Sequence, residues 1–203
     1  MDNNIIDQYL AHYSTSYRFE EITVSPGDNS RYHLSVTLLP LTPDKIDVDD
    51  LTGTRTEVRY DGTIPLQLDK ISLRYLHGDT KSYQGCRYTR TVIRILTGNI
   101  RMLYHRRYLT PLHRVNPALV RHDLGPRTSM RSGIITLMAP EVLTMEPYTY
   151  YRFLTGTRCL LLVTLWRHHN DDEGPNEVIM EEDDLRTLIS PPRPPIIGKP
   201  RHD

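Results

Sequence analysis

The residues that most restrict the fold of this chain lie between Tyr148 and Arg167. The segment holds two runs that are rich in aromatic, β-branched or large apolar residues, 148–153 (except Arg152) and 159–166, separated by Thr155-Gly156-Thr157. Two β-favouring runs around a short break that contains glycine are typical of a β-hairpin. The second run is apolar at both alternating sets of positions, so both faces of its strand should be covered. We therefore predict that 159–166 is the central strand of a sheet.

Three further pairs of β-favouring segments surround turn sequences and also predict hairpins. In the second pair Asp61-Gly62 suits a type I′ turn, and Pro65 places the following strand at a sheet edge. A helix is the alternative over the third pair. Single strands are predicted over 71–76, with one face half-buried, and over 134–138. The predicted pairs are 17–24 with 32–39, 56–60 with 63–68, and 88–96 with 100–104.

Two helices are predicted near the ends of the chain. Residues 2–14 place apolar side chains three and four positions apart, which is typical of an amphipathic helix. Residues 176–190 predict an acidic helix bounded by Gly-Pro and Pro-Pro. The apolar positions include Ile6 and Leu10 in the first helix and Leu185 and Leu188 in the second.

The last thirteen residues, 191–203, contain five prolines and predict a flexible or polyproline tail. With this tail and the N-terminal helix set apart, the chain is divided into an arm over 1–16, a core domain over 17–190 and a tail. A length of 203 residues suits one such domain.

Charge is distributed very unevenly, although the formal net charge is zero. Residues 80–140 carry eleven basic side chains and a single acid, Asp123, whereas residues 171–184 carry eight acids and no base. Separated blocks of opposite sign are typical of surfaces that meet a partner. Arg90 and Arg94 share one face of their predicted strand, and we expect that face to be exposed.

The best candidate for function is the basic segment 101–131. We predict that its residues 105–131 form a long loop, because they include proline and glycine but show little apolar periodicity. Arginine interleaved with tyrosine can bind single-stranded nucleic acid through phosphate contacts and stacking. The same composition can lie on an anionic membrane surface, or be a salt-bridged surface with no ligand. The arginines singled out are Arg101, Arg106, Arg107, Arg114 and Arg121.

The sequence contains no recognisable catalytic signature. It has no Gly-x-Ser-x-Gly, no glycine-rich phosphate loop and no Cys-x2-Cys. His168-His169 beside Asp171-Asp172 could hold a metal, but such residues more often form a polar strand end. We therefore expect no catalytic residues, no metal, no cofactor and no enzymatic activity.

The cysteines and the N-terminus bear on the compartment. Two cysteines, Cys86 and Cys159, do not suggest a disulfide scaffold, and we expect both to be buried in a reducing compartment. No apolar run approaches the length of a membrane span, and the first residues lack the pattern of a signal peptide. We expect a protein that is cytosolic or faces the cytosol.

Three segments are similar to a known family. Arg152-Phe-Leu-Thr-Gly-Thr-Arg-Cys-Leu-Leu-Leu-Val-Thr-Leu-Trp-Arg-His-His-Asn-Asp-Asp172 resembles the strand, short turn, alternating strand and acidic exit of rhabdovirus matrix proteins. Residues 32–40 resemble the first core strand of that family, and residues 91–99 resemble its middle strand. The lysine-rich arm and the Pro-Pro-x-Tyr motif common in the family are absent here.

This resemblance implies an α+β fold: a mainly antiparallel sheet with a few packed helices in a single domain. The implied function is that of a viral matrix protein, which self-associates, condenses the ribonucleoprotein and links it to the membrane during assembly and budding. The five arginines would contact phosphates of lipid or RNA, and Ile6, Leu10, Leu185 and Leu188 would contact neighbouring subunits.

The partners implied by the resemblance are other copies of the chain, the viral nucleoprotein, an anionic membrane surface and RNA. The implied location is the virion and the host cytoplasm, peripheral to the membrane. The alternatives are a viral RNA-binding module, such as a movement or silencing-suppressor protein, and a coat subunit with a jelly-roll sheet.

Overall fold

The strands of the protein form two antiparallel sheets. The computed structural model describes residues 3–26, 32–42, 51, 60–61, 64–86, 89–108, 129–154, 158–168 and 177–189. The first sheet, in spatial order, is β1 (Tyr17–Pro26), β2 (Tyr32–Pro40), β4 (Ile64–His77), β11 (Arg158–His168), β6 (Arg90–Thr97) and β9 (Val142–Met145), with β3 (Tyr60–Asp61) paired to β4. The second is β12 (Glu177–Met180), β5 (Tyr83–Cys86), β10 (Thr149–Leu154), β7 (Asn99–Tyr108) and β8 (Ser129–Met138).

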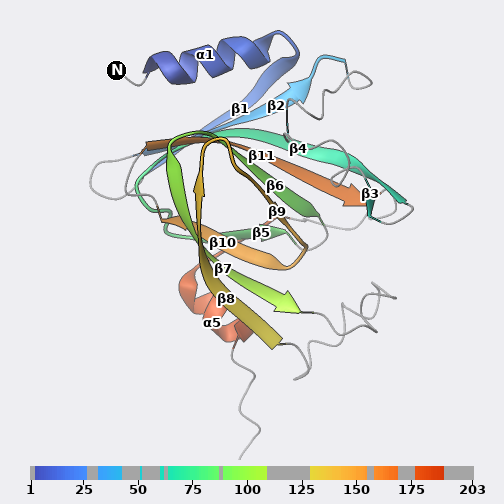
Figure 1. The fold of residues 1–203 in the computed structure, drawn as a ribbon, viewed down its shortest axis with the longest axis vertical. Coiled ribbons are helices and arrows are strands. Elements are labelled where there is room, and N and C mark those ends of the chain that lie inside the picture. Colours follow the sequence, from blue (N-terminus) through green and yellow to red (C-terminus); the bar gives the residue numbers. More distant parts are fainter. Residues whose placement is uncertain are drawn as a thin grey trace, which may run out of the picture.

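This architecture corrects the α+β expectation. The protein is a β-sandwich, because side chains from both sheets share one core that includes Ile93, Ile100, Phe153 and Leu161. Two helices are described, α1 (Asn3–Ser14) and α5 (Glu182–Ile189), and they lie at opposite ends of the molecule (Figure 1). The apolar strands therefore cover one another, and helices are not needed to bury most of the sheet surface.

Strand β11 is the central strand that the sequence predicts, since β4 and β6 pair with it on its two sides. Its odd-numbered residues from Cys159 to Leu165 enter the core between the sheets. Leu160 and Leu162 enter a second cluster, on the opposite face of the same sheet. Both faces of β11 are therefore covered, as its doubly apolar pattern predicts.

The predicted hairpin of 148–153 with 159–166 is wrong. Strand β10 pairs with β5 and β7 in the second sheet, whereas β11 lies in the first. The predicted hairpin of 88–96 with 100–104 is also wrong, because β6 and β7 lie in different sheets. In both places the chain passes from one sheet to the other, which is how a sandwich buries two consecutive apolar strands on a shared core.

The first predicted hairpin is confirmed by the antiparallel pairing of β1 with β2 from Tyr17 and Pro40 to Pro26 and Tyr32. Strand β4 lies between β2 and β11 and is not an edge strand. Pro65 is tolerated because it pairs only with β3, before the ladder to β11 begins at Leu66.

The basic segment is not a loop over its whole length. Residues 99–108 form β7, which pairs with β8 over 129–138 from Asn99 and Met138 to Tyr108 and Ser129. Residues 109–128 lie outside the described part of the chain. The acidic helix is also shorter than expected, because residues 177–180 form β12 and pair with β5.

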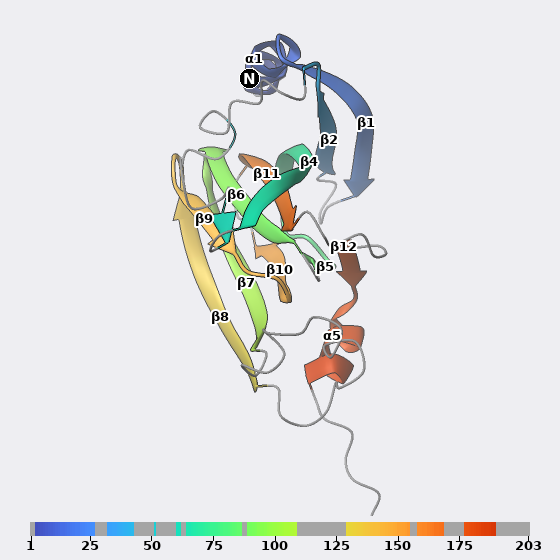
Figure 2. The ribbon, with the colours of Figure 1, turned by 90° about the vertical axis from the view of Figure 1, so that its right-hand side faces the viewer.

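Helix α1 confirms the predicted N-terminal helix and covers the second cluster. Ile6 and Tyr13 are buried there against Val36, Leu73 and Leu162. At the other end, Leu185 of α5 packs with Tyr83, Tyr150 and Met180 on the outer face of the second sheet. Figure 2 shows the two helices at opposite ends from a second direction. Within the described residues, neither helix has the length and apolar character needed to cross a membrane.

Candidate functional site

A cleft of about 500 Å³ lies where β1, β2 and β4 of the first sheet face β5, β10 and β12 of the second. Its inner end adjoins the core between the sheets through Leu76, Cys86 and Tyr151, which belong to both. Its outer side lies between β1 and β12, which are at the edges of the two sheets among the strands that the structure describes. The cleft is therefore a continuation of the sandwich interior that reaches the surface.

The wall contributed by the first sheet is polar because of strand alternation. On β4, residues 71, 73 and 75 point to the cluster under α1, so Arg74 and Leu76 point toward the second sheet. The neighbouring strands continue this face with short polar side chains. Those residues are Thr23 and Ser25 on β1 and His33 and Ser35 on β2, and Thr23 and Arg74 both pair with Ser35.

The opposite wall is built by β5, β10 and β12, which contribute Gln84, Tyr151, Glu177 and Ile179. Gly85 allows β5 to lie close against β10. A Cβ atom at Gly85 would be 2.5 Å from Cδ1 of Tyr150 and 2.7 Å from the carbonyl oxygen of Thr149. This close approach holds the Gln84 side chain opposite the first sheet.

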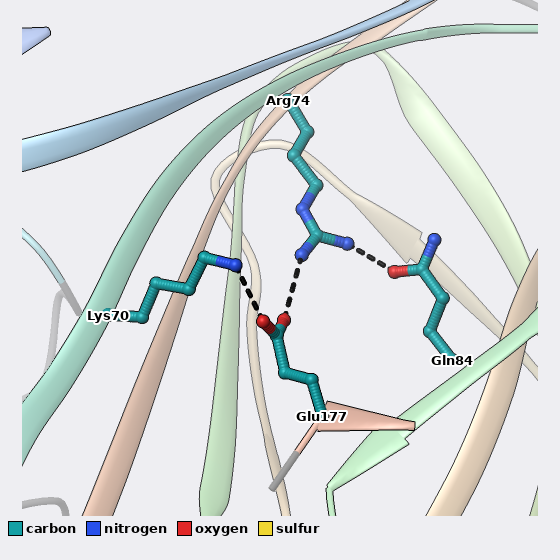
Figure 3. Close-up of polar contacts among 4 residues, drawn as sticks. All are labelled: Lys70, Arg74, Gln84 and Glu177. Atoms are coloured by element: carbon teal, nitrogen blue, oxygen red, sulfur yellow. Dashed lines mark hydrogen bonds and ion pairs between the residues drawn. The ribbon is translucent and has the colours of Figure 1, made fainter. Parts of the chain in front are cut away.

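Four side chains from three strands form a polar network across the cleft (Figure 3). The ammonium nitrogen of Lys70 is 2.5 Å from Oε2 of Glu177. Nη2 of Arg74 is 3.8 Å from Oε1 of the same carboxylate, and Nη1 of Arg74 donates a hydrogen bond to Oε1 of Gln84. Two cations thus share one carboxylate.

Arg74 is the most enclosed charged member of this network, with only 12% of its side chain exposed. Its Nε–H is buried and has no hydrogen-bond partner among the described residues. Burying a guanidinium is costly unless its charge and its donors are matched. The Nε–H of Arg74 is therefore a buried donor that still lacks an acceptor in the described structure.

The neutral groups at the inner end stay neutral at physiological pH. Burial raises the pKa of Tyr151 to about 12, although the nearby positive charge of Arg74 opposes the shift. Burial also raises the pKa of the Cys86 thiol. The charged groups of the cleft are then Lys70, Arg74 and Lys81 against Glu177, so the cleft is cationic.

Both cysteines, Cys86 and Cys159, are buried and not disulfide-bonded, which confirms the expected burial.

The predicted anion-binding arginines are not gathered on one surface in the described part of the chain. Arg101 is exposed and Arg106 half-buried, and an odd separation along the regular strand β7 places them on opposite faces. The backbone of Arg107 is also in β7, but its side chain lies outside the described residues, as do Arg114 and Arg121 entirely. Their contact with lipid or RNA stays a prediction.

The residues assigned to self-association are mostly packed inside the chain itself. Ile6 and Leu185 are buried, and Leu10 packs against the cluster under α1. The side chain of Leu188 lies outside the described residues. Their contact with neighbouring subunits stays a prediction, but the described side chains already have partners within the fold.

The sequence reasoning missed the cleft. The one sequence feature that could have indicated it is Arg74, a charged residue in a strand whose other residues are mostly apolar. The face of the strand that carries Arg74 was expected to be the exposed side of a half-buried strand. The exposed face predicted for Arg90 is also wrong. Nη2 of Arg90 lies 3.2 Å from Oε1 of Glu146, and only 14% of its side chain is exposed.

The arrangement suits binding of an anion. Within the part of the chain that the structure describes, no three His, Cys, Asp or Glu side chains are grouped to hold a metal ion. The cleft instead presents N–H donors from Arg74 and Lys70 beside neutral and apolar groups. Donors of this kind form strong charge-assisted hydrogen bonds with carboxylate or phosphate.

Comparison with known proteins gives structural similarity only. No family model and no curated protein matches the chain. The Lactobacillus farciminis oxalate decarboxylase in its formate complex is 11% identical over 86% of this chain and 36% of that chain, with a TM-score of 0.40. The hydroquinone 1,2-dioxygenase PnpCD is 12% identical over 53% of this chain and 59% of that chain, with a TM-score of 0.35. Drosophila melanogaster CENP-C bound to CAL1 is 7% identical over 79% of this chain and 93% of that chain, with a TM-score of 0.38.

These matches correct one expectation. The chain was expected not to be an enzyme, and the matched structures include a decarboxylase and a dioxygenase. The expectation that the chain has no enzymatic activity is therefore withdrawn. The chain covers less than two thirds of either enzyme, and at these identities and TM-scores the matches assign it no reaction, substrate or metal.

Proposed function

We propose that the protein binds a small anionic molecule in the cleft between its sheets and that Arg74 is the main residue that holds it. The supporting observation is the state of Arg74. Its guanidinium is nearly enclosed, shares a single carboxylate with Lys70, and keeps a buried Nε–H without a partner in the described structure. An anion in the cleft supplies both the charge and the acceptor.

The size of the cleft is consistent with this function. Ligand sites for small organic molecules are clefts of roughly 300 to 1,000 Å³ with a few placed polar groups among apolar ones. A volume of about 500 Å³ falls in this range. The polar groups converge on one region, around Arg74, and the apolar groups lie at the inner end and at Ile179.

Replacing Arg74 by methionine is expected to weaken anion binding by roughly tenfold to a hundredfold. A hydrogen bond to a charged group contributes about 1.5 to 3 kcal/mol, and methionine keeps the length of the side chain without donors. The measurement is isothermal titration calorimetry of wild type and Arg74→Met with acetate, hexanoate and inorganic phosphate.

The matched control is Arg90→Met. Arg90 is buried to a similar degree and also pairs with one glutamate, but it does not line the cleft. This variant should bind each probe as the wild type does. Equal affinities of the wild type and Arg74→Met would contradict the proposal.

A second candidate function is self-association, which is the part of the expected matrix function that an observation favours. Ile134 and Met138 are 55% and 57% exposed on the outer face of β8. Among the described strands β8 pairs with β7 alone, so its other edge is open. Two copies that pair along β8 about a twofold axis would bring the same apolar stripe together. The ribonucleoprotein, membrane and RNA partners stay predictions.

Changing Ile134 to lysine is expected to shift the protein from dimer or larger species to monomer. A lysine on an edge strand opposes both strand pairing and apolar contact. Light scattering across a protein concentration series measures the change. Ile22→Lys, at an exposed apolar position on β1, is the control and should keep the oligomer. A wild type that stays monomeric throughout the series contradicts this candidate.

A further inference from the structure

We infer that the ligand is a carboxylate attached to an apolar body. In the structure, the carboxylate of Glu177 occupies the position beside Arg74 that the ligand carboxylate takes on binding. This inference rests on the proposed function. It names the ligand class of the cleft and the group that the ligand displaces.

The position and contacts of Glu177 allow a ligand to displace its carboxylate from Arg74. It lies on β12, an edge strand of four residues that pairs only with β5 among the described strands. About 40% of its side chain is exposed, whereas Arg74 is almost enclosed behind it. Its carboxylate contacts Lys70 at 2.5 Å but stands 3.8 Å from Arg74. A charge-assisted N–H···O contact is normally about 2.7 to 2.9 Å, so the contact to Arg74 is the weak one.

The planar shape of the guanidinium favours a carboxylate. Gln84 accepts from Nη1 of Arg74, which leaves the edge formed by Nε and Nη2 for another acceptor. Two parallel N–H donors match the two oxygens of a carboxylate. Glu177 shows that a carboxylate group already fits beside Nη2. A ligand carboxylate can engage both nitrogens, while Glu177 keeps its contact with Lys70.

The surroundings favour an apolar body on that carboxylate. Leu76, Tyr151 and Cys86 line the inner end, and the raised pKa values keep the hydroxyl and thiol neutral there. Ile179 lines the cleft from β12 with 74% of its surface exposed. An apolar body would cover Ile179, and removing apolar surface from water favours binding.

The test compares wild type and Glu177→Gln by isothermal titration calorimetry with acetate, hexanoate and inorganic phosphate. Removing the negative charge of Glu177 is expected to tighten hexanoate binding roughly tenfold, because the ligand carboxylate then no longer approaches a like charge beside Arg74. Hexanoate should bind both proteins more tightly than acetate. The matched control, Glu146→Gln, removes an equally exposed carboxylate from Arg90 and should change nothing.

The outcomes separate the two proposals. If neither wild type nor Glu177→Gln binds any of the three probes, the proposed function itself fails. If wild type binds but Glu177→Gln binds no more tightly, only the exchange with Glu177 is overturned. Phosphate binding more tightly than hexanoate overturns the ligand class.

Thermal unfolding gives a second readout of the same difference in affinity. Glu177→Gln leaves Lys70 and Arg74 without their shared carboxylate, so its melting temperature should fall slightly. Added hexanoate should raise that temperature more than it raises the temperature of wild type or Glu146→Gln. Equal shifts in all three proteins would overturn the inference.

Discussion

Replacing Gly98 by alanine is expected to lower the free energy of unfolding by on the order of 3 kcal/mol. Gly98 lies where the chain leaves β6 in the first sheet and begins β7 in the second. Its φ of +81° is a conformation that side chains other than glycine rarely adopt. A Cβ atom there would also be 2.4 Å from the carbonyl oxygen of Arg158. Both the backbone strain and the clash must be relieved by moving main chain.

Urea unfolding measures this loss, and Gly133→Ala is the control. The three atoms nearest to a Cβ atom at Gly133 would all belong to the ring end of Tyr104, from 2.7 Å, and that half-buried side chain can rotate away. The control should therefore lose clearly less stability than Gly98→Ala. If both variants unfold at the same urea concentration, the tight crossing between the sheets at Gly98 is not present in the protein.

Truncating either Leu161 or Leu162 to alanine is expected to cost about 2 to 5 kcal/mol, which is the usual cost of a cavity at a fully buried leucine. The two residues are adjacent in β11, and both are fully buried. Leu161 points into the core between the sheets and Leu162 into the cluster under α1. In an ordinary sheet with one exposed face, one of the two changes would be nearly neutral.

Chemical denaturation of the two variants tests whether both faces of β11 are covered. The control is Ile22→Ala, which removes an exposed apolar side chain on β1 and should change the stability by no more than about 0.5 kcal/mol. A Leu162→Ala protein as stable as this control would show that α1 does not cover its face of the sheet.

The central, buried position of β11 also matters for the cleft. Arg74 of β4 is the cross-strand partner of Leu161, so the site arginine is anchored beside the most buried strand of the protein. The opposing residue Glu177 comes from an edge strand with fewer neighbours. This difference is the reason to expect that ligand binding moves Glu177 and leaves Arg74 in place.

Parts of the fold that depend on local patterns could be predicted. The doubly apolar run 159–166 indicated a central strand, and β11 has that position. The three- and four-residue spacing near the N-terminus indicated α1, and turn residues between two β-favouring runs indicated the pairing of β1 with β2. Each of these features is set by residues close together in the chain, where period and turn chemistry are sufficient.

The candidate site could not be predicted in the same way. Alternation on β4 places Arg74 on one face, but it does not reveal whether water or a second sheet lies opposite. The extended conformation of residues 105–108 could not be predicted either, because arginine and tyrosine there interrupt the apolar period. These residues were predicted to be a loop and form part of β7. The arginines therefore had no predictable common face.

For elements such as β1, β2, β11 and α1, the sequence by itself determined which segments are extended or helical and which of their sides must avoid water, because these properties depend on residue type and period. Residues 105–108 and 177–180, which form strands against the prediction, are exceptions. Only the tertiary structure decided that β10 and β11, and likewise β6 and β7, belong to different sheets. The physical reason is that any apolar surface can bury an apolar strand, so the residue pattern of the strand does not specify which other strand pairs with it. The placement of Arg74 opposite Gln84 and Glu177 follows from that choice of partners, and the cleft with it.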